Sequence, residues 1–243
     1  MILYLLINSL HVDDLNSGAD SLDSAVNFYQ KCQDRLKEAG FTLRKFESNC
    51  KQLENLVNEQ NFTSFNLTKV LGLLWNKKED NLIFDFRNLT HNDDSILTKR
   101  KVLQFIASVY DALGIVNPFI VKCKVFFQKL CIKKLNWDKP FEGKMLLVWQ
   151  AIINDIQSSK PIIIPRWYHN NYSNHVVDFS LHGFSDASSI VFSCCIYLCS
   201  FDDKHKVCSL IIAKSRIDQN KNTSIPRLEL KAALLLAKTM STV

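Results

Sequence analysis

The chain has 243 residues and a mass of 28.0 kDa, which is enough for one large domain or two modest ones with a buried core. Hydrophobic residues make up 47% of the chain and charged residues 22%. These values are close to the averages of soluble globular proteins, so a disordered, collagen-like or coiled-coil protein is excluded. No apolar run approaches the roughly 18 residues that span a bilayer, so no membrane partner is expected.

The net charge of +6 is unevenly distributed along the chain. Residues 1–97 carry a net −4, residues 98–160 a net +7 and residues 161–243 a net +3. A basic middle segment is typical of a module that binds a polyanion. A lysine-rich helical surface exposed to solvent would give the same count, so charge alone leaves both interpretations open.

The beginning of the chain carries one strand pattern and one helix pattern. The apolar run Leu3–Leu10 predicts a strand, which ends at a turn that begins with His11. Asp20 or Ser21 can cap the helix, and Gly40 stands where a glycine that follows a helix end belongs. The apolar face of this helix consists of Leu22, Ala25, Val26, Tyr29, Cys32 and Leu36.

Extended segments follow within the first 97 residues. Phe41–Phe46 has the pattern of a strand. Lys69–Trp75 and Leu82–Phe86 flank the polar residues 77–80, which predicts a hairpin. The region is therefore expected to mix helix and sheet.

Residues 98–160 have the pattern of three helices. Thr98 can cap the first, and Gly114 and Pro118 are expected to end it. A second, basic helix follows, and a third runs from about Lys144 to Ser158. The apolar residues of the first two are Val102, Phe105, Ile106, Val109, Val121, Val125, Phe126 and Leu130.

The last third of the chain changes to strands. Pro161–Pro165 is predicted to be an extended linker and a domain boundary. Strands are predicted at Val176–Phe184, Ile190–Cys199 and Lys206–Ala213. An apolar helix begins near Pro226, since proline favours the first helical turn. We therefore divide the chain at residues 97 and 165.

The eight cysteines do not have the spacing of a disulfide framework. No C-x-x-C pair occurs, so a zinc knuckle has no ligand set. We expect free, buried thiols in a reducing compartment, and hence an intracellular protein, cytoplasmic or nuclear. Cysteines in helical patterns are Cys32, Cys123 and Cys131, and those in one apolar strand are Cys194, Cys195 and Cys199.

Two adjacent carboxylates, Asp13 and Asp14, directly follow the first apolar run. Neighbouring side chains of a strand point to opposite faces, so both can serve one cation only at a tight turn. Paired acids at such a turn suit Mg²⁺ or Mn²⁺, which are hard ions that take oxygen ligands. Taken alone, a plain surface turn explains the pair more simply, because aspartate favours turns.

Two further acids stand out by their position. Asp186, in GFSDAS, emerges from an otherwise apolar strand, where an unpaired carboxylate is costly to bury. Glu229, in IPRLEL, lies in the first turn of the last helix, where its charge would also complement the helix dipole. A strand aspartate, two more strands and then a helical glutamate form an order that is more informative than either residue alone.

That order resembles the first half of a ribonuclease H domain, and nearly all of the chain resembles a stretch of the Pol polyprotein of Pao/BEL-type retrotransposons. GFSDAS and AKSR…IPRLELKAALLLA match that family's pattern closely, and residues 98–119 (TKRKVLQFIASVYDALGIVNPF) resemble the segment after its polymerase palm. Residues 11–21 (HVDDLNSGADS) resemble the Y-V-D-D turn of reverse transcriptases. Residues 69–76 (KVLGLLWN) resemble the primer-grip hairpin that follows it.

The resemblance implies an α/β (α+β) fold in three parts. Residues 1–97 would be the C-terminal part of a reverse transcriptase palm, residues 98–165 a basic helical thumb or connection, and residues 166–243 the N-terminal half of a ribonuclease H-like domain with a mixed sheet and a helix. The family polymerises DNA on an RNA template and cleaves RNA–DNA hybrids, in both cases with two Mg²⁺ (or Mn²⁺) ions.

By this resemblance, Asp13 and Asp14 would serve the polymerase site, and Asp186 and Glu229 the ribonuclease site. The expected partners are template–primer or RNA–DNA hybrid and the remainder of the Pol polyprotein. The helices would contact the nucleic-acid backbone without reading its sequence. The candidate contacts are Lys99, Arg100, Lys101, Lys122 and Lys124.

The sequence also departs from the family pattern. His11 replaces the tyrosine that usually precedes V-D-D, and Ala112 replaces the proline of D-P-L-G. The remaining carboxylates of both metal sites are expected outside these 243 residues. We therefore expect neither activity from this chain by itself.

Two other functions are alternatives to this one. A non-catalytic remnant would still bind hybrid nucleic acid through residues 98–160. An aspartic peptidase is disfavoured, because its sites need a D-[ST]-G turn and none occurs. P-loop and Rossmann nucleotide binding are excluded, because neither glycine motif occurs.

Overall fold

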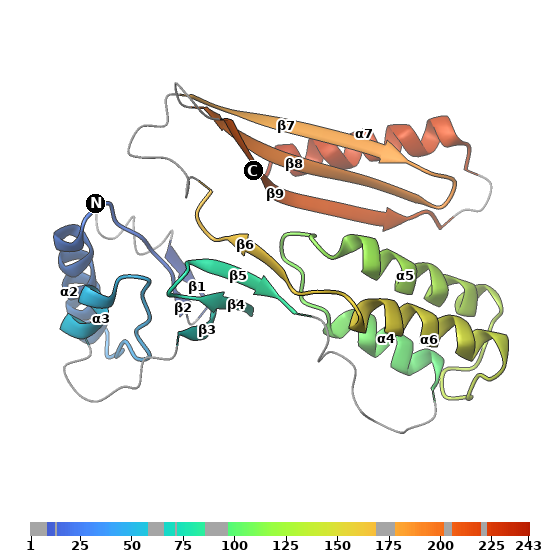
Figure 1. Ribbon diagram of the computed structural model, residues 1–243, viewed down its shortest axis with the longest axis horizontal. Helices are drawn as coiled ribbons and strands as arrows, with labels where there is room; N and C mark the ends of the chain where they lie inside the picture. The colour runs from blue at the N-terminus through green and yellow to red at the C-terminus, as the bar shows by residue number, and fades with distance from the viewer. Residues whose placement is uncertain are drawn as a thin grey trace. The chain divides into compact units, whose positions relative to one another are not determined.

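The computed structural model describes residues 9–12, 14–57, 66–70, 72–85, 97–168, 178–201, 206–219 and 223–243. The chain divides into two compact units, Met1–Ile83 and Phe84–Val243. Both combine helices with antiparallel strands (Figure 1), which is a mixed α/β architecture. No helix in the described ranges is long and apolar enough to cross a membrane.

The first unit begins with a tight hairpin between strands β1 (Leu10–His11) and β2 (Asp14–Leu15). Leu10 pairs with Leu15 and His11 with Asp14, so the chain reverses directly after His11, as the sequence predicts. Val12, in the turn, has a φ of 55° and is 86% exposed. Asp13 and most of the predicted strand Leu3–Leu10 lie outside the described residues.

Helices α2 (Leu22–Glu38) and α3 (Lys51–Val57) follow the hairpin. Of the two candidate caps, Ser21 is the one used, since its hydroxyl accepts the Ser24 N–H at 3.2 Å. Gly40, at a φ of 81°, reverses the chain after α2, and the Phe41 N–H donates to the Leu36 carbonyl at 2.8 Å. Both features of the helix ends therefore agree with the sequence.

The predicted strand at residues 41–46 is wrong. This segment is irregular, and Lys45 has a φ of 55°, which lies outside the strand region. Phe46 instead packs against Tyr29 of α2, with ring centroids 5.0 Å apart. Of the apolar residues that suggested a strand, Phe46 therefore contacts a helix, whereas Phe41 is exposed.

A three-stranded antiparallel meander completes the first unit, with β3 (Leu67–Val70), β4 (Leu73–Asn76) and β5 (Asn81–Phe84). The predicted turn at residues 77–80 is confirmed between β4 and β5, but the predicted strand Lys69–Trp75 is divided between β3 and β4. Lys77 lies there with 5% of its side chain exposed, and its Nζ contacts Glu54 Oε1 at 2.7 Å and a carboxylate oxygen of Glu47. This buried ion-pair cluster joins the meander to α3.

Three helices form the first half of the second unit: α4 (Lys99–Ser108), α5 (Asn117–Ile132) and α6 (Lys144–Gln157). The Thr98 hydroxyl caps α4 as predicted, accepting the Lys101 N–H at 3.4 Å. Pro118 lies in the first turn of α5. Both α4 and α6 pack on α5, and the Phe126 and Trp149 rings lie 5.4 Å apart in the core between α5 and α6.

A short strand, β6 (Ile162–Pro165), follows α6 where the sequence predicts a linker. The helices of residues 98–165 and the sheet after them belong to one compact unit. The domain boundaries at residues 97 and 165 remain predictions.

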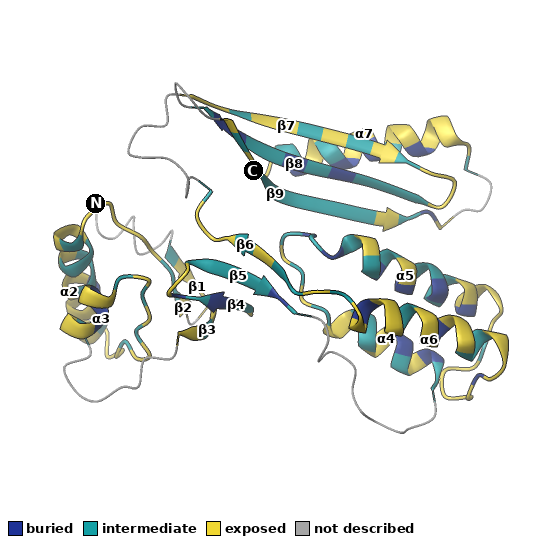
Figure 2. Ribbon diagram, viewed as in Figure 1, coloured by how far each residue is buried: buried dark blue, intermediate teal, exposed yellow. Residues whose placement is uncertain are grey.

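The second half of this unit is an antiparallel meander of three long strands, β7 (Asp178–Ala187), β8 (Val191–Phe201) and β9 (Lys206–Ile217), followed by α7 (Ile225–Met240). Helix α7 packs on β7 and β8 through a stripe that is buried along one side (Figure 2). Both pairings in this three-stranded sheet are antiparallel, so its described part lacks the parallel strand that a mixed sheet requires. The stripe consists of Leu228, Ala232, Leu235 and Thr239.

The loop before α5 lies along the outer edge of β9. The Ala213 N–H donates to the Leu113 carbonyl at 2.8 Å, and the Asn117 side-chain amide donates to the Ala213 carbonyl at 3.1 Å. Gly114 has a φ of 74°, and a Cβ on it would lie 1.9 Å from the Ala213 carbonyl oxygen. Asp111 holds the loop by accepting the Ile115 and Val116 N–H groups. The segment YDALGIVNP therefore joins the helices to the sheet.

One cysteine expectation is corrected by the structure. Cys199 on β8 and Cys208 on β9 form a disulfide, although free thiols were predicted. The strand register places these two residues directly opposite each other, with Cα atoms 4.2 Å apart. Sequence spacing could not reveal this pair, because it depends on the register. The other six cysteines are free, and Cys32, Cys123 and Cys194 among them are buried as expected, whereas Cys131 is exposed.

Candidate active site

Asp186 lies near the C-terminal end of β7 and is exposed. Successive strand residues point to opposite faces. Gly183 lies under α7, since a Cβ on it would be 2.8 Å from Leu236 Cδ1. Ser185 and Ala187 therefore share the α7 side, and Asp186 projects from the other face.

The direction of α7 is set by its contacts with β8. The Lys231 ammonium lies 5.9 Å from the centre of the Phe192 ring, and Phe192 pairs with Ala187 at the end of β7. Further along the helix, Thr239 contacts Cys194. Because Lys231 lies in the first half of α7, the helix begins at the same end of the sheet as Asp186.

Glu229 lies in this first part of α7 and is exposed. It precedes Leu236 by seven residues, and residues seven apart lie on nearly the same side of a helix. Since Leu236 lies over Gly183 of β7, Glu229 is on the flank of α7 that faces β7. The strand acid and the helix acid are therefore at the same end of the same strand.

Around Asp186 and Glu229, the described residues form no larger group of metal ligands. Within them, no group of three or more histidine, cysteine, aspartate or glutamate side chains is placed to hold a metal ion. Asp186 also projects from one face of β7, whereas Glu229 lies on the helix that packs on the opposite face. The described part of the chain therefore offers two carboxylates at one strand end and no enclosed metal cage.

The other acid pair is only partly described. Asp14 is exposed in β2 and pairs with His11 in the first hairpin, whereas Asp13 lies outside the described residues. The hairpin supplies the tight turn that two adjacent acids need to serve one cation. No nearby third acid is found among the described residues.

Several of the predicted nucleic-acid contacts are engaged within the protein. Arg100 forms a two-pronged ion pair with Asp138, at 2.7 and 3.0 Å, and the hydrogen bond raises the pKa of the guanidinium. Lys122 pairs with Asp155 at 2.5 Å. Lys99 is 8% exposed, and its ammonium lies 4.3 Å from the centre of the Trp137 ring. Three of the five candidates therefore interact with other groups of the protein.

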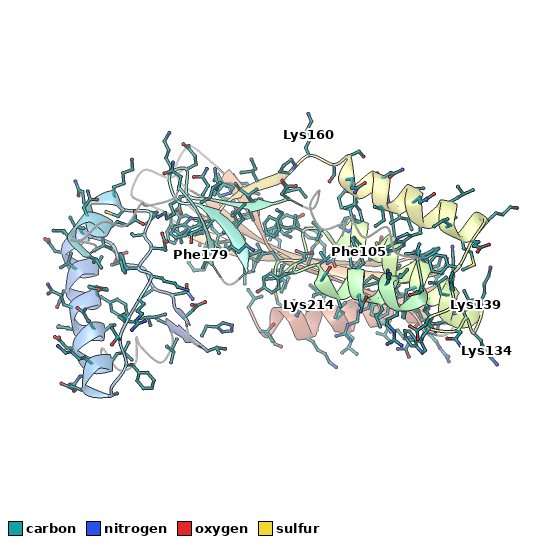
Figure 3. The ribbon with its side chains drawn as sticks, turned by 90° about the horizontal axis from the view of Figure 1, so that it is seen from below. Phe105, Lys134, Lys139, Lys160, Phe179 and Lys214 are labelled. Atoms are coloured by element: carbon teal, nitrogen blue, oxygen red, sulfur yellow. A yellow bond between two sulfur atoms is a disulfide. The ribbon has the colours of Figure 1, made fainter. Side chains whose placement is uncertain are left out.

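The two remaining candidates are Lys101 and Lys124. The Lys101 N–H is the group that Thr98 caps. Lys124, on α5, lines an open cavity of about 240 Å³ between α5 and β9. Two basic residues of β9, Lys214 (labelled in Figure 3) and Arg216, line the same cavity.

Sequence reasoning missed Lys214 and Arg216 because it ended the third strand at Ala213, whereas β9 continues to Ile217. The available signal was the spacing of the two residues. Basic residues at positions i and i+2 of a strand lie on one face. Extending the strand pattern by four residues would have shown them as a pair.

Comparison with known protein families gives a match to the part of the chain that contains these elements. The model of one protein family, described as the Pao retrotransposon-like RNaseH-like domain, matches residues 98–243. No curated protein matches the chain. The matched range contains both α7 and the three long strands, and it includes Asp186 and Glu229. Because the match covers more than half of the residues, the chain belongs to the Pao retrotransposon family, and its second unit contains the RNaseH-like domain.

Proposed function

We propose that the chain is a part of a retrotransposon Pol polyprotein that cleaves the RNA strand of RNA–DNA hybrids, with Asp186 and Glu229 as carboxylate ligands of Mg²⁺ or Mn²⁺. The observation that carries the proposal is the placement of a strand aspartate and a helix glutamate at one end of β7. The family match supports the proposal, because its description is RNaseH-like and its range includes both residues.

The chemistry of the two side chains suits such an ion. Carboxylate oxygens are the ligands that Mg²⁺ prefers, and both residues are exposed, so a cation and a substrate have access to them. When bound, a pair of ions would activate the attacking water and stabilise the leaving oxygen. The described part of this chain adds no third acid, so we expect weak metal binding and no cleavage by the chain alone.

The first unit would contribute to DNA synthesis. The hairpin of β1 and β2 supports this proposal, because it makes the tight turn that the Asp13–Asp14 pair needs. His11 stands in the strand beside this turn and pairs with Asp14. In the proposed function, these two acids hold the metal ions of the polymerase site.

Calorimetry with Mn²⁺ and Mg²⁺ tests the ribonuclease proposal on the full chain. The variants are wild type, the double variant Asp186→Asn/Glu229→Gln and the control Asp178→Asn, which removes an exposed acid from the opposite end of β7. Binding by wild type and by the control, with loss in the double variant, is the expected result. Equal binding by all three folded proteins would contradict the assignment of Asp186 and Glu229.

Nucleic-acid binding without catalysis is the second candidate function. It is favoured by the basic cavity of Lys124, Lys214 and Arg216, which does not depend on either acid pair. Binding by this function would fall steeply with salt, because phosphate contacts release counterions.

A further inference from the structure

We propose that the cavity between α5 and β9 binds a phosphate group of the nucleic-acid backbone, with Lys124, Lys214 and Arg216 as its cationic ligands. The choice of nucleic acid as the source of the phosphate rests on the proposed function. The site itself rests on the cavity and its charges.

The cavity has the size and openness for such a group. Its volume of about 240 Å³ is several times the roughly 30 Å³ that one water occupies in the liquid, and it opens to solvent. It is lined by the loop before α5, by α5 itself and by five consecutive residues of β9, Ile212 to Arg216. A backbone phosphate can therefore reach its interior from outside.

The charges that line the cavity favour an anion. In the described part of the chain, no salt bridge joins a carboxylate to Lys124, Lys214 or Arg216, in contrast to Arg100 and Lys122. The charge of Asp111 attracts Lys124 without forming a salt bridge. These three side chains can therefore offer their N–H donors to a ligand.

One acid, Asp111, also lines the cavity, and each of its two oxygens accepts a backbone N–H group. Its Oδ1 accepts the Ile115 N–H at 3.0 Å and its Oδ2 accepts the Val116 N–H at 2.9 Å. Three cations therefore face one carboxylate whose hydrogen bonds are made within the loop.

The fold leaves the basic residues of β9 accessible. Lys214 pairs with Cys194 and Arg216 with Phe192, so both lie on the side of the sheet where α7 packs. Helix α7 covers β7 and β8, and β9 lies beyond it. The hydrogen bonds of Ala213 to the loop before α5 hold this part of the strand beside α5.

The test is a titration of a labelled RNA–DNA hybrid of about 18 base pairs by the full chain, followed by fluorescence anisotropy in EDTA between 50 and 200 mM salt. The variant Lys214→Ala/Arg216→Ala is compared with Lys139→Ala/Lys160→Ala, which removes two exposed charges elsewhere in the same unit (Figure 3). Circular dichroism confirms that both variants are folded.

We expect the cavity variant to weaken binding at least tenfold and to reduce the slope of log K against log salt by about 0.9, the contribution of the one phosphate contact that is lost. The control should change the affinity less than threefold. Equal losses in the two variants would show that only net charge matters, and they would overturn the proposal. No loss in either variant would overturn it as well.

A second titration with inorganic phosphate distinguishes the source of the group. If the cavity binds free phosphate, phosphate binding is lost in Lys214→Ala/Arg216→Ala while hybrid binding is unchanged, and nucleic acid is then the wrong source. Because EDTA removes divalent ions, neither titration requires metal binding by Asp186 or Glu229. The phosphate site and the ribonuclease proposal can therefore fail separately.

Discussion

Substitution of Gly114 by alanine tests the junction between the helices and the sheet. Gly114 has a φ of 74°, and strain of this kind costs a residue with a side chain about 1–3 kcal/mol. The new Cβ would also lie 1.9 Å from the Ala213 carbonyl oxygen, so the loop must move away from β9. That movement breaks the hydrogen bonds from Ala213 to Leu113 and from Asn117 to Ala213, at about 1 kcal/mol each. We expect a total loss of about 3–5 kcal/mol.

Gly143→Ala is the matched control, because Gly143 also has a positive φ, of 62°, but nothing lies within 4 Å of its Cβ position. It should lose only the backbone strain. Urea unfolding of the full chain measures both losses, and hydrogen exchange followed by mass spectrometry locates the change in β9. If the two variants lose the same stability, and β9 exchanges no faster in Gly114→Ala, the junction does not hold the helices to the sheet and the reasoning is refuted.

Three further predictions concern buried groups. Lys77→Met should cost the first unit about 3–5 kcal/mol in urea unfolding, because Glu54, with 8% of its side chain exposed, loses its partner. The double variant Lys77→Met/Glu54→Gln should recover part of this loss of stability. No recovery would contradict the ion-pair explanation. Reduction of the disulfide between β8 and β9 should destabilise the second unit by about 2.6 kcal/mol, the loop-closure value for a separation of nine residues. An unchanged unfolding midpoint would count against it. Burial raises the pKa of the Cys123 thiol to about 11, so at pH 8 it stays protonated; iodoacetamide should modify exposed Cys131 and leave Cys123 intact, as peptide mass spectrometry would show.

The ends of several helices follow from the sequence because they depend on groups a few residues apart. Ser21 and Thr98 each cap the helix that follows, and Gly40 ends α2 as its position predicts. These contacts form within one turn, so the local sequence contains all the atoms involved. The strand predicted at Phe41–Phe46 fails for the opposite reason, since a strand needs a partner and Phe46 finds Tyr29 of α2 instead.

The order of strands and helix that contains Asp186 and Glu229 is also determined by the sequence, through periodicity and family pattern. Their position at one end of β7 is decided by the tertiary structure, because it depends on which way α7 runs across the sheet. The same holds for the Cys199–Cys208 disulfide, which needs the register of β8 on β9. Arg100 differs from Lys214 for a similar reason: both are basic in the sequence, but only the fold brings Asp138 to Arg100 and leaves Lys214 at an open cavity. Sequence periodicity determines which residues share one face of a helix or strand. Which residues of different helices and strands contact each other is decided only when these elements pack together.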